Sequence, residues 1–149
     1  MENEQEKKVE KYLITERLKK EIRKDLQIDE FDLEGQCRNM TNVVQKYLEM
    51  YFSRKRLLDS LKLESSYKFA DYYKKYRYGG QGVPLKADSG ADAKILIERH
   101  DDYRILQEEI KKLERLVDFL DETVENMRQN FWMIKNIIAI RDMENKDNA

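Results

Sequence analysis

The sequence predicts an all-α protein in which two long helices are joined by a glycine-rich loop and preceded by a shorter N-terminal helix. Charged residues make up 40% of its 149 residues, which include one proline and five glycines. So few helix breakers among so many charges are typical of long helices and not of a β-sandwich or a doubly wound sheet. The length is enough for a single helical domain over residues 1–149.

The second observation is a heptad pattern from Tyr103 to Ile138. Its seam holds eleven consecutive apolar positions at alternating steps of three and four, which predicts a helix of about five repeats. A second, broken apolar stripe runs beside the seam, so we expect this helix to pack against its own chain and against further copies, as a coiled-coil-like homo-oligomer. The residues assigned to oligomerisation are Leu106, Ile110, Leu113, Val117, Leu120, Val124, Met127, Phe131, Trp132, Ile134 and Ile138.

The apolar stretch Phe131–Ile138 leaves two interpretations open, because a helix that is apolar on nearly all sides needs partners all round. It fits a subunit interface, and it equally fits an intrachain core against the N-terminal helix.

The N-terminal part of the chain is predicted to form one helical arm over residues 9–77. Residues 1–8 are expected to fray, and a first helix is expected from Val9 to about Gln27. Asp29 is a candidate N-cap for the second helix, from about Glu30 to Arg77. Gly35 lies inside that helix and is expected to loosen its first turns.

The loop is predicted over residues 78–90, which contain four of the five glycines and the only proline. Asp88 and Ser89 at its end are candidate caps for the next element. Periodicity does not decide whether Ala91–Arg99 is a helix or an extended piece. The C-terminal arm is expected over residues 91–143, with Asp101 as a cap of the long helix and residues 144–149 as a frayed tail.

The distribution of charge indicates an anionic partner for the middle of the chain. Residues 53–78 carry eight basic and three acidic side chains, whereas residues 1–34 and 91–149 are both net acidic. Such a basic block attracts polyanions. The alternative is an ordinary solvated helix face.

Within this block, residues 67–78 interleave six aromatic with four basic side chains. Rings stack on unpaired bases while lysine and arginine follow the phosphates, so the pattern favours single-stranded nucleic acid over duplex. Alternatively, the rings pack against the third helix, as some of them must. The candidate DNA-binding residues are Arg54, Lys55, Arg56, Lys62, Lys68, Phe69, Tyr72, Tyr73, Lys74, Lys75, Tyr76 and Arg77.

Other chemistry finds little support in the sequence. Cys37 is the only cysteine and His100 the only histidine. A disulfide framework is therefore excluded, and the ligands for a metal cluster and the residues for a histidine-based dyad are missing. The segment from Gly79 to Gly82 does not follow a strand and lacks the Lys-Ser/Thr of a phosphate loop. We expect no enzyme activity, no cofactor and no metal.

No apolar run reaches the roughly 18 residues of a membrane helix, and the N-terminus lacks a signal-peptide core, so an intracellular protein without a membrane role is expected.

Three stretches of the chain form a distinctive set. They are the segment Leu18–Asp29 (LKKEIRKDLQID), the tyrosine pair in Asp71-Tyr72-Tyr73 ahead of the glycine-containing loop, and the C-terminal pattern Phe131-x-x-Ile134-Lys135-Asn136-x-Ile138 with Arg141. Together they resemble the UvsY family of T-even phage recombination mediators. The order and spacing of these stretches are similar over residues 18–143.

The resemblance implies a non-enzymatic recombination mediator. Such a protein binds single-stranded DNA, forms ring-like homo-oligomers and helps to load a RecA-like recombinase onto DNA covered by single-strand-binding protein. It also implies phage origin and action in the host cytoplasm. The family ties a lysine and an arginine just before the tyrosine pair to DNA binding, and these positions fall on Tyr67 and Phe69 here. The positive charge that contacts DNA is therefore expected at Lys74, Lys75 and Arg77 instead. Alternatively, Phe69 takes over the stacking role of the family's arginine.

A rival interpretation is a chaperone-like or scaffolding coiled coil, similar in outline to a prefoldin subunit. It predicts binding to unfolded protein and indifference to DNA. The sequence favours the mediator, because its aromatic residues cluster with the basic block and not at exposed helix tips.

Overall fold

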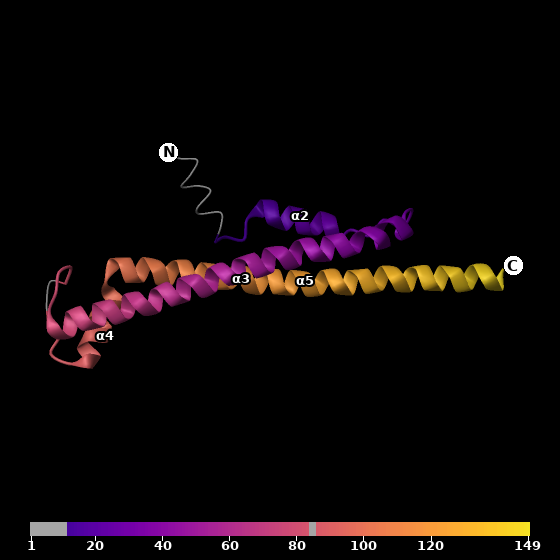
Figure 1. The fold of residues 1–149 in the computed structure, drawn as a ribbon. Helices are drawn as coiled ribbons and strands as arrows, with labels where there is room; N and C mark the ends of the chain where they lie inside the picture. The colour runs from indigo at the N-terminus through magenta and orange to yellow at the C-terminus, as the bar shows by residue number, and fades with distance from the viewer. Residues whose placement is uncertain (1–11, 84–85) are drawn as a thin grey trace. The chain divides into compact units, whose positions relative to one another are not determined.

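The described residues of the computed structural model, 12–83 and 86–149, form helices joined by short connections (Figure 1). In chain order these are α2 (Glu16–Leu26), α3 (Leu33–Tyr78), α4 (Gly90–Arg99) and α5 (Asp101–Asp147). The predicted fold class, a short helix followed by two long helices with a glycine-rich loop between them, is confirmed. The chain divides into two compact units: unit 1 contains the residues up to Arg54 and Arg115–Ala149, and unit 2 contains Lys55–Glu114.

The helix α2 begins at a capping threonine. Thr15 is the N-cap of α2, and its hydroxyl accepts a hydrogen bond of 3.1 Å from the backbone N–H of Leu18. Residues 12–15 are not helical, so the predicted helix from Val9 to about Gln27 is not continuous; Val9 itself lies outside the described residues. The threonine hydroxyl accepts a hydrogen bond from a backbone N–H of the first turn, which favours a helix start at this residue. The spacing of apolar residues does not show where such a cap lies.

The turn before α3 holds two capping aspartates. The carboxylate of Asp29 accepts from the N–H of Phe31, and the carboxylate of Asp32 accepts from the N–H of Gly35 at 3.1 Å. The cap of α3 is therefore Asp32, and the helix starts at Leu33, three residues after the predicted start at Glu30. A Cβ added at Gly35 would collide with the carboxylate of Asp32, so the glycine makes room for this cap.

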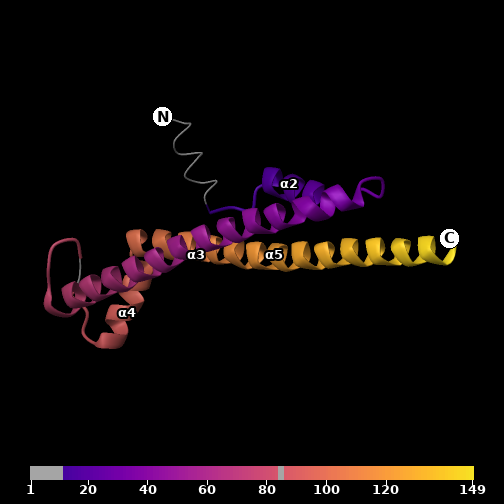
Figure 2. The ribbon, with the colours of Figure 1, turned by 45° about the vertical axis from the view of Figure 1, so that its right-hand side comes forward.

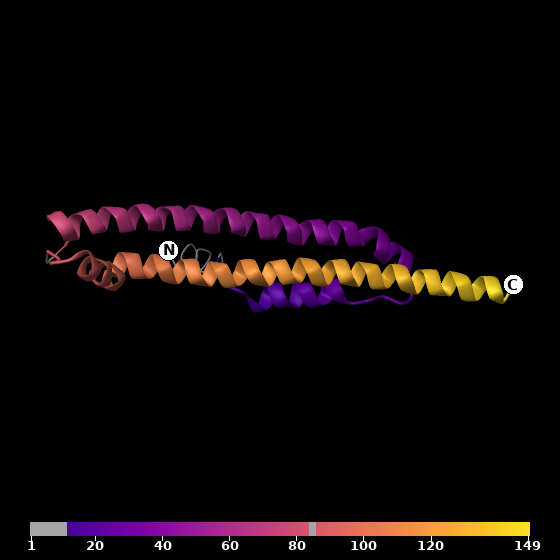
Figure 3. The same cartoon turned by 90° about the horizontal axis from the view of Figure 1, so that it is seen from below.

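Unit 1 is built from three helical segments: α2, the first part of α3 and the second part of α5. Figures 2 and 3 show α2 lying alongside these segments, with α3 and α5 running in opposite directions. The amide of Asn130 on α5 donates to the carbonyl of Leu26 at the end of α2. The buried apolar side chains of unit 1 are Leu18, Ile22, Leu33, Met40, Tyr47, Leu116, Val117, Leu120, Val124, Met127 and Ile134.

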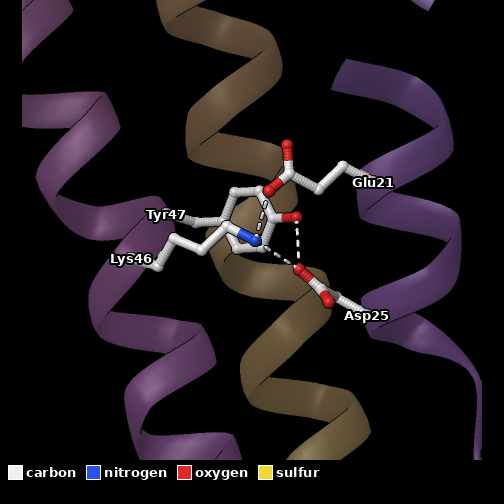
Figure 4. Close-up of polar contacts among 4 residues, drawn as sticks. All are labelled: Glu21, Asp25, Lys46 and Tyr47. Atoms are coloured by element: carbon white, nitrogen blue, oxygen red, sulfur yellow. Dashed lines mark hydrogen bonds and ion pairs between the residues drawn. The ribbon is translucent and has the colours of Figure 1, made fainter. Parts of the chain in front are cut away.

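A polar cluster joins α2 to α3 inside unit 1 (Figure 4). The ammonium of Lys46 lies 2.6 Å from Glu21 and 2.7 Å from Asp25, and the hydroxyl of Tyr47 donates to the same oxygen of Asp25 at 2.7 Å. Burial alone would raise the pKa of Asp25, but the hydrogen bonds from Lys46 and Tyr47 lower it below its usual value. Burial and the bond to Asp25 raise the pKa of Tyr47.

Most of the heptad seam is used within the chain itself. Eight of the eleven residues assigned to oligomerisation are at most 7% exposed in a single copy: Leu106, Ile110, Leu113, Val117, Leu120, Val124, Met127 and Ile134. Packing against the same chain is thereby confirmed, and the assignment of these eight to subunit contacts stays a prediction. A heptad pattern predicts that a helix is covered, but it does not identify the covering helix.

Unit 2 is closed by the short helix α4 and the loop before it. Ser89 caps α4 by accepting from the N–H of Asp92 at 3.1 Å, which confirms the predicted capping site and shows that Ala91–Arg99 is helical. Ala93 and Ile97 of α4 pack with Ala87 and the rings of α3 in one apolar cluster. In the loop, Gly79 and Gly82 have φ values of 88° and 89°, a region that favours glycine.

The long helix α5 extends beyond its predicted end at Met143. It continues to Asp147, and the N–H of Asn148 still bonds the carbonyl of Glu144 at 3.2 Å. Residues 144–147, which were expected to belong to a frayed tail, are therefore helical, and residues 148–149 are not. Backbone hydrogen bonds between neighbouring turns need no apolar side chains, so the loss of apolar content there does not end the helix.

Candidate nucleic-acid interface

The basic and aromatic segment forms the last part of α3, within unit 2. Two of its rings face inward: Tyr72 is 8% exposed and Tyr76 is 3% exposed. The hydroxyl of Tyr72 donates to Asp102 at 3.2 Å, and its ring lies 4.1 Å from that of His100. Burial, with the nearby charge of Asp102, raises the pKa of Tyr72. Both rings are largely covered by unit 2 itself, and the expectation that they contact DNA stays a prediction.

Phe69 and Tyr73 occupy the edge of the same apolar cluster. Their rings stack at a centroid distance of 6.1 Å, and Phe69 also lies 6.0 Å from Tyr103 on α5. A Cβ added at Gly90 would lie 2.7 Å from the hydroxyl of Tyr73, so the start of α4 closely approaches this tyrosine. Both rings are half-buried, and their main partners are other rings of unit 2.

Three of the candidate cations have partners within unit 2. The ammonium of Lys62 pairs with Glu114 at 3.1 Å, and Arg77 donates to the carbonyl of Asp88 at 3.1 Å. Lys75 pairs with Asp71 at 2.9 Å and lies 5.6 Å above the ring of Tyr72. These contacts fix the directions of the cations, while Lys62 remains exposed and Lys75 and Arg77 half-exposed.

The other candidate cations differ in their surroundings. Lys55 and Arg56 are exposed and make contacts within the chain, whereas Arg54 and Lys68 are half-buried. Lys74 is exposed and forms no ion pair with any residue that the structure describes. Arg54 and Lys68 form no ion pair with the described residues either, so Lys74 differs from them by its greater exposure.

Two exposed rings were missing from the predicted set. Tyr67 is 69% exposed and Tyr78 is 76% exposed, and both project from the same part of α3. Their spacing of eleven residues, which is three helical turns, places them on one face. That spacing is visible in the sequence. However, the six aromatic residues of 67–78 point in several directions around the helix, so the spacing alone does not distinguish exposed rings from buried rings.

The described residues contain no group of three or more His, Cys, Asp or Glu side chains that could hold a metal ion. Within the same residues, no helix is both long enough and apolar enough to cross a membrane. His100 lies between α4 and α5, where its Nε2 approaches the carbonyl of Gly82 at 3.4 Å.

Comparison with known proteins identifies the family. The model of the family described as "Recombination, repair and ssDNA binding protein UvsY" matches residues 21–147. The chain belongs to the UvsY family. The resemblance seen in the sequence is thereby confirmed. A comparison with curated proteins gave no match.

Solved structures of the bacteriophage T4 recombination mediator protein UvsY share the fold. One crystal form superimposes with a TM-score of 0.76 at 21% identity, covering 89% of this chain and 98% of that one. A second form gives a TM-score of 0.74 at 21% identity, covering 87% and 99%. At this level of identity the likeness concerns the fold, and the UvsY family membership rests on the family model.

Proposed function

We propose that this UvsY-family protein binds single-stranded DNA along the outer face of α3 in unit 2. The observation that carries this proposal is the exposed Lys74 between two exposed tyrosines, on the basic part of a chain that belongs to a family of single-strand-binding proteins. Cations there would follow the phosphates, and rings would stack on unpaired bases.

We also propose that the protein is a recombination mediator without enzymatic activity. It helps to load a RecA-like recombinase onto DNA coated by single-strand-binding protein, in the cytoplasm of a host cell infected by a phage. Stacking and phosphate contacts that are individually weak allow the strand to pass from one coating protein to another. Several copies acting together would still hold the strand, because the second contact of a linked set forms at high effective concentration.

We further propose that copies assemble, as a ring, through the outer face of the C-terminal part of α5. Four large apolar side chains are exposed there in a single copy: Trp132 by 67%, Met133 by 51%, Ile140 by 55% and Met143 by 66%. Their steps of one, seven and three place them on one side of the helix, away from the buried Ile134. Phe131 and Ile138, which are half-buried, lie on the opposite side of the helix, next to Ile134.

An apolar stripe of this kind on a charged protein supports a contact with another protein surface. A second copy is the occupant proposed, since the stripe repeats at heptad-like intervals suited to helix–helix packing. Of the residues originally assigned to oligomerisation, Trp132 keeps that role most fully.

Fluorescence anisotropy with labelled oligonucleotides tests the DNA-binding proposal. Single-stranded and duplex oligonucleotides of equal length are titrated at several salt concentrations. We expect tight, salt-sensitive binding with a clear preference for the single strand, because only unpaired bases expose their faces. Equal affinity for both would remove the stacking role, and no binding at low salt would favour the scaffolding coiled coil.

A further inference from the structure

The outer face of α3 in unit 2 carries a regular row of side chains. Tyr67 and Tyr78 lie eleven residues apart, and Leu63 and Lys74 are offset from them by four residues towards the N-terminus, again eleven apart. Leu63 is 56% exposed and Lys74 is also exposed. Eleven residues make three turns of an α-helix, so the row stays on one face along its whole length.

Neither ring is held by a specific contact within the described residues. Tyr67 and Tyr78 form no ring contact, hydrogen bond or ion pair there, in contrast to Phe69, Tyr72 and Tyr73. Burial of an aromatic side chain is strongly favourable, so two rings left this open are unusual unless something else covers them.

A lysine on the same face of the helix suits an anionic ligand. Lys74 lies between Tyr67 and Tyr78 along the helix, and it has no acidic partner among the described residues. Asp71, which is also between them, has its charge offset by the ion pair of 2.9 Å with Lys75. A strand that placed bases on the rings would therefore meet a cation between them.

We propose that Tyr67 and Tyr78 are two base-stacking positions on one strand, with Lys74 contacting a phosphate between them. This inference rests on the proposed single-strand binding and adds its stacking residues, which replace the buried Tyr72 and Tyr76. The ligand class is single-stranded nucleic acid of any sequence, because every base has a face to stack.

The spacing of the rings sets a minimum ligand length. At 1.5 Å per residue, eleven residues separate the two positions by about 16 Å along the helix. A stacked strand rises about 3.4 Å per nucleotide, so about five nucleotides connect the two stacked bases. An oligonucleotide much shorter than this reaches only one ring at a time.

The test compares the double variant Tyr67→Ala/Tyr78→Ala with the wild-type protein on two ligands. One is an oligothymidine of twelve nucleotides, and the other is an abasic strand of the same length, which keeps the phosphates but has no bases. We expect the double variant to lose oligothymidine affinity by about fivefold per ring, or about 25-fold together. Its affinity for the abasic strand and the salt slope should stay unchanged.

Two further variants serve as matched controls. Tyr67→Phe/Tyr78→Phe keeps the rings and should bind oligothymidine like the wild type. Leu63→Ala removes an exposed apolar side chain from the same face without removing a ring, and it should leave affinity for oligothymidine within about twofold, because surface substitutions of this kind have small effects.

The outcomes separate the inference from the function on which it rests. If the wild type binds oligothymidine and the alanine variant binds it equally well, the inference is wrong while single-strand binding stands. An equal loss on both ligands, lost helicity, or a changed sedimentation coefficient would also overturn the inference, since the rings would then serve another contact or the core. If the wild type binds neither strand, the proposed function itself fails.

Discussion

The hydroxyl of Tyr47 on α3 donates a hydrogen bond of 2.7 Å to the carboxylate of Asp25 on α2. The tyrosine is completely buried, and Lys46 beside it pairs with the same carboxylate. A buried hydroxyl and a charged acceptor form one of the stronger kinds of hydrogen bond in proteins. This contact therefore fixes α2 at a defined position on α3 within unit 1.

Replacing Tyr47 with phenylalanine should destabilise unit 1 without changing its packing. The loss of a hydrogen bond to a charged group predicts a decrease in the free energy of unfolding of about 1.5–3 kcal/mol. Urea unfolding followed by circular dichroism measures it. Tyr67→Phe, at an exposed ring, is the control and should change stability by less than about 0.5 kcal/mol. Equal effects of the two substitutions would contradict a stabilising role for the Tyr47–Asp25 bond.

Acid should weaken the same cluster. The hydrogen bonds from Lys46 and Tyr47 outweigh burial and keep the pKa of Asp25 lowered in the folded chain. The carboxylate therefore contributes stability that is fully present above the unfolded pKa of about 3.9 and is lost as the pH falls through the lowered folded value.

Thermal unfolding of the wild type and Asp25→Asn across pH 2–7 measures this contribution. The wild type should be the more stable near neutral pH, and the difference between the two proteins should shrink below about pH 4. Other carboxylates titrate in both proteins and cancel in the difference. A constant difference over the whole range would show that the charge of Asp25 is not involved.

Much of the fold could be predicted because its signals are local. The apolar seam of α5, the glycines of the loop and the capping serine Ser89 each act over a few residues. The partners of these elements could not be predicted in the same way. Leu120 and Val124 were predicted to be subunit contacts, because a heptad pattern does not identify the helix that covers it. The tyrosines divide similarly: Tyr72 and Tyr76 point inward and Tyr67 and Tyr78 outward, which depends on where α4 and α5 lie.

Removing three cations at the end of α3 should flatten the salt dependence of DNA binding. Replacing Lys74, Lys75 and Arg77 together with alanine should lower the slope by roughly two units, at about −0.7 per phosphate contact on a single strand. Anisotropy titrations at several salt concentrations give the slope. Lys62→Ala removes one cation instead of three and should change the slope by at most about 0.7. An unchanged slope in the triple variant would exclude these cations from the interface.

Charges placed on the outer face of α5 should separate copies without unfolding them. Trp132→Asp with Met143→Asp should reduce the sedimentation coefficient while helicity is kept, because both side chains are exposed in a single copy. Leu120→Asp with Val124→Asp is the contrasting pair and should unfold unit 1, since burying an unpaired charge is costly. Assemblies of unchanged size in the first variant would exclude the stripe as the subunit contact.

The division of the chain has a consequence for synthesis on the ribosome. Unit 2 is continuous in sequence, so all of its residues exist once Glu114 has emerged. Unit 1 joins both parts of the chain, and its bonds from Asn130 to Leu26 and from Arg141 to Glu30 connect residues more than 100 positions apart. Nascent chains halted with Glu114 just outside the ribosome should therefore protect unit 2 from protease, while α2 and the start of α3 remain cleavable until the C-terminal part of α5 has emerged.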